Sequence, residues 1–177
     1  MNSSYVSPLK FSLTQYEDSR GFFCEVFSER SLPDELRGIE FSQDNLSCSR
    51  KGVIRGLHAQ MPPKEQGKLV FVLKGQILDV IVSYRELNDS GVHVKKDAFV
   101  LNAGEALWVP PGYLHGFCAR SEETVVLYKV TADYAPEHEV CVQFNDPDLA
   151  IDWGEDQPIV SEKDRKGLSF QEFCNGI

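Results

Sequence analysis

Short apolar runs separated by glycine and proline turns fill the middle of this sequence and leave little room for helices. Five runs rich in β-branched and aromatic residues follow one another, at 68–73, 77–84, 98–101, 106–109 and 124–131. Such runs are typical of β-strands. Because they are short and closely spaced, they predict an antiparallel β-sandwich or barrel. A further strand is expected at 140–144.

Helices are expected at only two places. In the segment 31–36, Ser31 can cap a helix and Pro33 would lie in its first turn. A second short helix is expected near the C-terminus. The chain has 177 residues, of which 42% are hydrophobic, so it can bury a core of ordinary size. We therefore predict a single domain spanning residues 1–177.

The formal net charge of −9 argues against a nucleic-acid partner and against an anionic membrane surface. A small anionic ligand remains compatible with it, because such a ligand responds to a few local Arg and Lys side chains. The five cysteines form no Cys-x-x-Cys pair, which favours reduced thiols over a disulfide framework or a zinc site. The N-terminal residues lack the features of a signal peptide. We expect a soluble cytoplasmic protein.

A base and two cations lie close together in the segment 52–70. Arg55 and His58 belong to one apolar run, and Lys68 opens the next. Successive strand residues point to opposite faces, so Arg55 and His58 would diverge unless the backbone bends at Gly56. If these three side chains meet, they suit an anionic substrate that carries an acidic proton.

A second pattern, G-x5-P-x-G-x2-H, runs from Gly104 to His115. This spacing resembles the second motif of the cupin superfamily of jelly-roll barrels. In metal-binding cupins the first motif supplies His-x-His, whereas this chain has His58-Ala59-Gln60 at that place. Because glutamine is a poor ligand for a transition metal, we predict no catalytic metal.

Several segments in order carry a closer resemblance, over roughly residues 10–165. They are Asp18-Ser-Arg20-Gly-Phe-Phe-Cys-Glu25, Gln43-Asp-Asn45, Gly52-Val-Ile-Arg-Gly-Leu-His58, Gln66-Gly-Lys68, Leu107-Trp-Val-Pro-Pro-Gly-Tyr-Leu-His115, Tyr128-Lys, Tyr134-Ala-Pro-Glu-His-Glu139, Asn145-Asp-Pro-Asp and Ser161-Glu-Lys163-Asp164. Together they resemble the dTDP-4-dehydrorhamnose 3,5-epimerases of deoxysugar biosynthesis. The resemblance implies a mainly β, cupin-type antiparallel jelly-roll barrel with a few short helices. It also implies a nucleotide-diphosphate sugar substrate, no cofactor, and a homodimer whose N-terminal segment reaches the neighbouring subunit.

Epimerisation beside a ketone removes a proton and returns it to the opposite face. This reaction needs a base, an acid and a group that stabilises the enolate. By resemblance, His58 is the base and Tyr128 the acid, while Lys68 stabilises the enolate oxygen. Asp164 is expected to orient His58, with Asp152 as the rival for that role.

The remaining matches are polar or aromatic residues that the resemblance assigns to substrate binding. Arginine suits bidentate contacts with a diphosphate, and an aromatic side chain suits stacking on the base of the nucleotide. The matching residues are Arg20, Glu25, Gln43, Asn45, Arg55, His115, Tyr134, Glu139 and Lys163. We expect Arg20 and Glu25 to act in the site of the neighbouring subunit.

Three residues depart from the usual pattern of the family: Leu46, Ala59 and Ser83. We expect Ala59 to enlarge or reshape the pocket beside His58, which leaves the substrate open. The alternatives are an epimerase of C3 only or C5 only, and one that acts on a CDP- or GDP-linked 4-keto sugar. A metal-dependent cupin oxygenase or isomerase and a non-catalytic sugar-binding jelly roll are the other classes considered.

Overall fold

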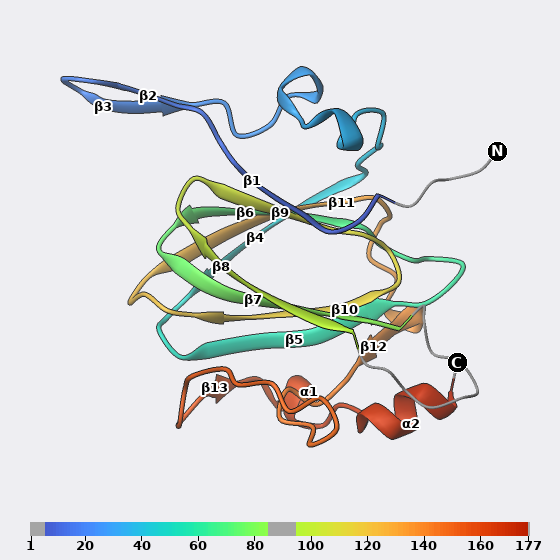
Figure 1. The fold of residues 1–177 in the computed structure, drawn as a ribbon. Helices are drawn as coiled ribbons and strands as arrows, with labels where there is room; N and C mark the ends of the chain where they lie inside the picture. The colour runs from blue at the N-terminus through green and yellow to red at the C-terminus, as the bar shows by residue number, and fades with distance from the viewer. Residues whose placement is uncertain (1–5, 85–94, 177) are drawn as a thin grey trace.

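Two antiparallel sheets face each other in the computed structural model, which describes residues 6–84 and 95–176 (Figure 1). The first sheet has the order β1 (Leu9–Ser12), β9 (Glu105–Val109), β6 (Lys68–Lys74), β11 (Thr124–Val130) and β4 (Gln43–Ser49). The second has the order β12 (Glu139–Cys141), β5 (Val53–Gln60), β10 (Tyr113–Ala119), β7 (Gln76–Ser83) and β8 (Lys96–Asn102), with β13 (Ile159–Val160) parallel to β5. This architecture confirms the prediction of an antiparallel, mainly β fold.

The chain changes sheets at Gly75, because β6 belongs to the first sheet and β7 to the second. Gly75 has a φ of 82°, and an added Cβ atom would lie 2.8 Å from the carbonyl oxygen of Glu123. A residue with a side chain would be strained there and would clash with the backbone. Gly75 therefore sets the crossover between the two sheets.

Other segments pack on the outer face of each sheet, which explains why β6, β7, β9 and β10 are buried along most of their length rather than alternating. The core between the sheets includes Val70, Val72 and Ile81. Behind the second sheet, Trp153, Phe170 and Phe173 of the C-terminal segment pack on strand residues, and on the outer face of the first sheet Leu32 and Leu36 pack against Trp108. In Figure 1 the C-terminal segment (orange to red) runs below β5.

The helix expected at 31–36 is wrong. Two 3-10 turns occupy the region, η1 (Glu29–Ser31) and η2 (Asp34–Leu36), and Ser31 ends the first of them. The residue before a proline avoids the helical region, and Leu32 is indeed extended, with a ψ of 148°. Pro33 therefore separates the turns.

The C-terminal helix is confirmed, and it is accompanied by a shorter one. These are α1 (Glu162–Arg165) and α2 (Phe170–Asn175), the latter with a Ser169–Glu172 capping box. The strand expected at 140–144 is shorter, because β12 ends at Cys141 and Val142 makes only an isolated bridge to Leu168. A hairpin of β2 (Gln15–Asp18) and β3 (Gly21–Cys24) projects from the sheets, and η3 (Pro136–His138) precedes β12. None of the described helices has the length and apolar character needed to cross a membrane.

Candidate active site

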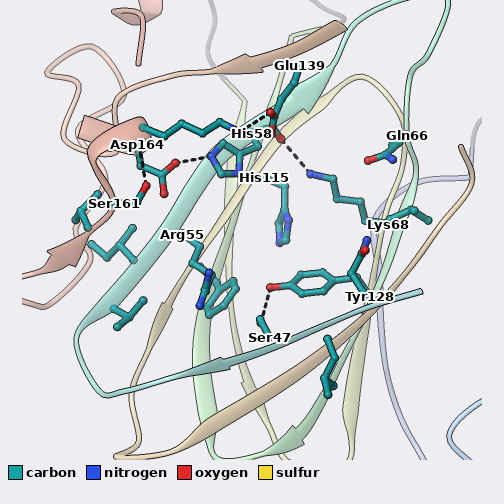
Figure 2. A pocket seen from close by; sticks show the side chains of 18 of the residues that line it. Ser47, Arg55, His58, Gln66, Lys68, His115, Tyr128, Glu139, Ser161 and Asp164 are labelled. Atoms are coloured by element: carbon teal, nitrogen blue, oxygen red, sulfur yellow. Dashed lines mark hydrogen bonds and ion pairs between the residues drawn. The ribbon is translucent and has the colours of Figure 1, made fainter. Parts of the chain in front are cut away.

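A pocket of about 660 Å³ opens between the two sheets. The first sheet and the second each supply side chains to it, and α1 closes one side (Figure 2). Nine of the residues expected at the site line this pocket: Asn45, Arg55, His58, Lys68, His115, Tyr128, Glu139, Lys163 and Asp164.

Arg55 and His58 share the pocket because the backbone bends between them at Gly56. Gly56 has a φ of 107°, and the register between β5 and β10 shifts between His115 and Phe117. A Cβ atom on Gly56 would lie 2.5 Å from the carbonyl oxygen of His115 and 2.6 Å from the Cα atom of Gly116. The close approach of β5 and β10 therefore requires glycine at position 56.

Gly56→Ala is expected to lower the free energy of unfolding by about 3 kcal/mol, through positive-φ strain and a backbone clash. Gly38 is the matched control, because its φ is 81° but no atom lies within 4 Å of an added Cβ. Gly38→Ala should cost only about 1 kcal/mol. Urea denaturation of the two variants checks the difference, and equal losses would show that the strand contact adds nothing.

His58 and Asp164 form a close pair. The His58 Nε2 atom lies 2.6 Å from Asp164 Oδ1, and the carboxylate is 4% exposed. The backbone N–H of Gly56 donates to Asp164 Oδ2 at 3.4 Å, and the Asp164 N–H donates to the Ser161 hydroxyl, which caps α1. Burial alone would raise the pKa of Asp164, but the hydrogen bond and charge of His58 outweigh it and the pKa is lowered. Asp164 therefore stays ionised beside the imidazole.

Asp152, the rival partner for His58, has a different role. Its Oδ1 atom accepts a hydrogen bond from the backbone N–H of Gly154 at 2.8 Å, within a loop. The expectation that it could orient His58 is wrong, because its carboxylate accepts this hydrogen bond within its own loop.

Lys68 lies half-buried at the side of the pocket, with its ammonium pointing toward His58 (Figure 2). Its Nζ atom donates to the carbonyl oxygen of His58 at 3.2 Å. Burial lowers the pKa of Lys68 to about 8, and the negative charges of Glu139 and Asp79 oppose this shift. Lys68 is thus an ammonium that loses its proton more easily than an exposed lysine does.

Tyr128 faces His58 from the opposite sheet (Figure 2). Its hydroxyl lies 3.2 Å from the Ser47 hydroxyl, and its ring packs at a tilt on Phe117. Burial raises the pKa of Tyr128, so the phenol holds its proton at neutral pH. Ser47 was not anticipated from the sequence, where a serine in a polar strand gives no signal.

His115 makes a second pair with Asp79, at 2.9 Å between Nε2 and Oδ2. Both residues are buried, and His115 is the cross-strand neighbour of His58. Asp79 was also not anticipated, although the sequence holds a signal for it. A lone aspartate in the apolar run 77–84 must be buried with a partner.

A polar network closes the end of the pocket. Glu139 forms an ion pair with Lys163 and accepts a hydrogen bond from the Tyr134 hydroxyl at 2.8 Å. Burial would raise the pKa of Glu139, but Lys163 and Tyr134 outweigh it and the pKa is lowered. Gln43 accepts from the Tyr134 N–H at 3.0 Å and donates to Asn45 at 2.7 Å. Gln43 and Tyr134 are therefore hydrogen-bonded to residues that line the pocket, Asn45 and Glu139.

Arg55 adds a cation to the pocket, held by the Ser49 hydroxyl at 3.0 Å and the Cys48 carbonyl at 3.3 Å. Arg20 and Glu25 are placed elsewhere. Arg20 lies in the turn of the projecting β2–β3 hairpin, where it pairs with Asp18, and Glu25 follows β3 (Figure 1). The structure thus brings the expected residues together except for these two.

The residues of the cupin metal motif are engaged by other partners. The Gln60 amide donates to the carbonyls of Lys64 at 2.7 Å and Asp133 at 3.2 Å, and it accepts from the Ala135 N–H at 2.8 Å. His115 Nε2 already faces Asp79. A catalytic metal held by His58, Gln60 and His115 therefore does not fit. Gln60 instead ties together the two loops beside the pocket, a role that the sequence did not reveal.

Ala59 does not reshape the pocket, contrary to expectation. It is 4% exposed and packs in the core behind the second sheet, because it points to the opposite face from His58. Of the three departures, Leu46 is the one that lines the pocket, at its rim, where it is 67% exposed.

Known proteins resemble the chain over most of its length. A family model described as dTDP-4-dehydrorhamnose 3,5-epimerase matches residues 7–172. The dTDP-4-dehydrorhamnose 3,5-epimerase of Pseudomonas aeruginosa is 40% identical over 159 residues, which are 89% of this chain and 87% of that protein.

Solved structures agree with the sequence comparison. A dTDP-4-dehydrorhamnose 3,5-epimerase from Bacillus anthracis, with TDP and PPi bound, has a TM-score of 0.85 and 37% identity, covering 96% of this chain and 98% of that one. The Legionella pneumophila dTDP-6-deoxy-D-glucose-3,5-epimerase, in complex with dTDP-4-keto-L-rhamnose, has a TM-score of 0.82 and 37% identity, covering 97% and 92%. This likeness confirms the cupin-type jelly roll.

Proposed function

The chain belongs to the dTDP-4-dehydrorhamnose 3,5-epimerase family, and from this premise we propose that it epimerises dTDP-4-dehydro-6-deoxyglucose at C3 and C5. One observation carries the proposal. The His58–Asp164 pair and the Tyr128 phenol face each other across a pocket, and the Lys68 ammonium enters the pocket from the side. A base and an acid on opposite sides of one carbon are what inversion of that carbon requires.

The reaction proceeds through proton transfers alone. His58 takes the proton from the carbon beside the ketone, and the electrons of the broken C–H bond move to the carbonyl oxygen as an enolate. Asp164 stabilises the imidazolium that forms, while Lys68 stabilises the developing negative charge on oxygen. Tyr128 then returns a proton to the opposite face of the carbon, which inverts it. The same groups act at the second carbon after the sugar shifts in the pocket.

The nucleotide end of the substrate meets the polar network of Gln43, Asn45, Tyr134, Glu139 and Lys163, and Arg55 contacts the diphosphate. Charge supports this assignment, since guanidinium groups suit bidentate contacts with phosphate oxygens. The TDP-bound and dTDP-sugar-bound relatives support the same class of ligand. His115 contacts the sugar from the floor of the pocket.

A homodimer is part of the proposal. The projecting hairpin exposes Tyr16, Phe22 and Phe23, which are 62%, 62% and 69% exposed, and apolar surface of this kind favours a protein partner. In the dimer, Arg20 and Glu25 would contribute to the neighbouring subunit's site. A single domain over residues 1–177 and a cytoplasmic location also remain predictions.

Proton NMR in deuterated water, with dTDP-4-keto-6-deoxyglucose as substrate, tests the function. We expect deuterium to enter at C3 and C5, with a product of inverted configuration at both. Exchange at one carbon would indicate a C3-only or C5-only epimerase. A faster reaction with the CDP- or GDP-linked sugar would show that this nucleotide, rather than dTDP, is the preferred one. If the dTDP-, CDP- and GDP-linked sugars all stayed unlabelled and unchanged, only a sugar-binding role would remain.

Exchange should also depend on pH through Lys68. The rate is expected to fall as the pH rises past about 8, the pKa of Lys68, because the neutral amine no longer stabilises the enolate. Lys68→Met should slow exchange at neutral pH by about 100-fold or more and remove this decline. Lys74→Met on the same strand is the control. A decline above pH 8 that persisted in Lys68→Met would assign it to another group.

The stability of the fold should also depend on the ionisation of Lys68, and it should rise with pH where the exchange rate falls. Because the folded-state pKa of Lys68 is lowered from its ordinary 10.5 to about 8, the unfolded chain binds the proton more tightly. The contribution of Lys68 to stability therefore rises with pH between about 8 and 10.5. Urea midpoints of the wild type and of Lys68→Met across this range report the difference.

A further inference from the structure

Cys141 lies beside the His58–Asp164 pair, and the proposed reaction does not use it. It ends β12 and is the cross-strand neighbour of His58 on β5. Its Sγ atom lies 3.8 Å from Asp164 Oδ1, and the side chain is half-buried. One ligand atom from each of His58, Cys141 and Asp164 can be chosen so that all three lie within 4.8 Å of one another.

We propose that His58, Cys141 and Asp164 form an inhibitory site for Zn²⁺ or a similar thiophilic divalent cation. Imidazole nitrogen, thiolate sulfur and carboxylate oxygen are the three ligand types that Zn²⁺ takes in proteins. A mixed set with one thiolate selects Zn²⁺ and Cd²⁺ over Mg²⁺ and Ca²⁺, which prefer oxygen ligands. This set is distinct from the cupin metal motif, whose Gln60 is bound to backbone groups.

The present geometry is close to what such an ion needs. A tetrahedral Zn²⁺ holds its nitrogen, oxygen and sulfur ligands about 3.3–3.6 Å apart. The separations to Asp164 Oδ1 bracket that range, at 2.6 Å from His58 Nε2 and 3.8 Å from Cys141 Sγ. Opening the His58–Asp164 contact by about 0.7 Å would bring it into that range.

The scaffold also favours binding. The antiparallel pairing of β5 with β12 fixes His58 relative to Cys141, and the Ser161 cap fixes α1, which carries Asp164. The neighbouring Lys163 ammonium is already paired with Glu139, so it does not compete for Asp164. Binding releases the thiol proton to solvent, and water can take the fourth coordination position.

The consequence for activity rests on the proposed function. An ion bound at His58 Nε2, the nitrogen beside Asp164, leaves the ring proton on Nδ1, which would otherwise accept the substrate proton, and it draws Asp164 away from the ring. Bound metal should therefore stop exchange at both carbons, and a chelator should restore it. Cys141 would make the enzyme sensitive to thiophilic cations without taking part in epimerisation.

A binding experiment tests the site independently of activity. Purified full-length protein is titrated with Cd²⁺, and the ultraviolet charge-transfer band of a cadmium–thiolate bond is followed. We expect one equivalent to bind, the band to disappear in Cys141→Ala, and the band to persist in the control Cys48→Ala, whose cysteine is exposed. Isothermal titration calorimetry with Zn²⁺ should show an affinity at least about 10-fold weaker in Cys141→Ala than in the wild type. Circular dichroism checks that each variant is folded.

Each outcome decides the matter. A cadmium–thiolate band of undiminished strength in Cys141→Ala, or no band in the wild type, would overturn the site. Wild-type exchange that stops with Zn²⁺ and recovers with EDTA, while Cys141→Ala keeps its basal exchange and resists Zn²⁺, supports it. Metal bound through Cys141 without any loss of exchange would uphold binding but overturn inhibition, and it would count against His58 as the base.

Discussion

His58→Ala is expected to abolish deuterium exchange at C3 and at C5 together, with a loss of at least about 1,000-fold at each carbon. In the proposed mechanism His58, paired with the ionised Asp164, is the base, and the other histidine that lines the pocket, His115, faces Asp79. A single base must therefore serve both carbons. Proton NMR in deuterated water measures each position separately in one sample.

The control for this variant is His138→Ala, which removes an imidazole from η3, beside the pocket rather than in it. Its exchange rates should match the wild type. Asp164→Asn should lie between the two, because it leaves His58 in place but removes the charge that stabilises the imidazolium. Exchange retained at either carbon in His58→Ala would contradict a single base.

Tyr128→Phe is expected to separate exchange from inversion. Deuterium should still enter the substrate, because His58 and Lys68 remain, but formation of the inverted product should fall by about 100- to 10,000-fold. The phenyl ring keeps its packing on Phe117, and only the hydroxyl beside Ser47 is lost. NMR in deuterated water distinguishes labelled starting material from labelled product.

Tyr113→Phe provides the comparison, since it removes a hydroxyl from a tyrosine that packs against the core between the sheets. That variant should invert the sugar at the wild-type rate. If Tyr128→Phe did the same, Tyr128 would not be the acid, and a solvent molecule or His115 would have to return the proton.

The strands could be predicted from the sequence because local chemistry determines them. β-Branched runs between Gly75, the Asn-Ala-Gly turn and the Pro-Pro-Gly turn leave few alternatives to extended chain. The sequence could not show that β6 and β7 belong to different sheets, because pairing depends on the whole barrel. The helix expected at 31–36 failed for a local reason, since Pro33 forces Leu32 to be extended.

The site shows the same division between local and distant information. His58, Lys68 and the bend at Gly56 could be proposed from one continuous segment. The contact between His58 and Asp164 joins residues 106 positions apart, and only the family resemblance indicated it. Ala59 lies away from the pocket although it follows His58 in the sequence, because neighbouring strand residues point to opposite faces. Gln60 and Ser47 gave no signal, because their partners are set by the fold.

The position of α1 has a consequence for when the protein becomes active. Apart from the two-residue β13, the strands of the two sheets are complete by Cys141 at the end of β12, whereas Asp164 follows in the segment that covers the second sheet. Protein chains fold from the N-terminus as they leave the ribosome. Residues 159–164, which supply one wall of the pocket and the carboxylate partner of His58, are therefore synthesised after the other residues that line it. We expect catalytic turnover to begin only when this C-terminal segment has docked.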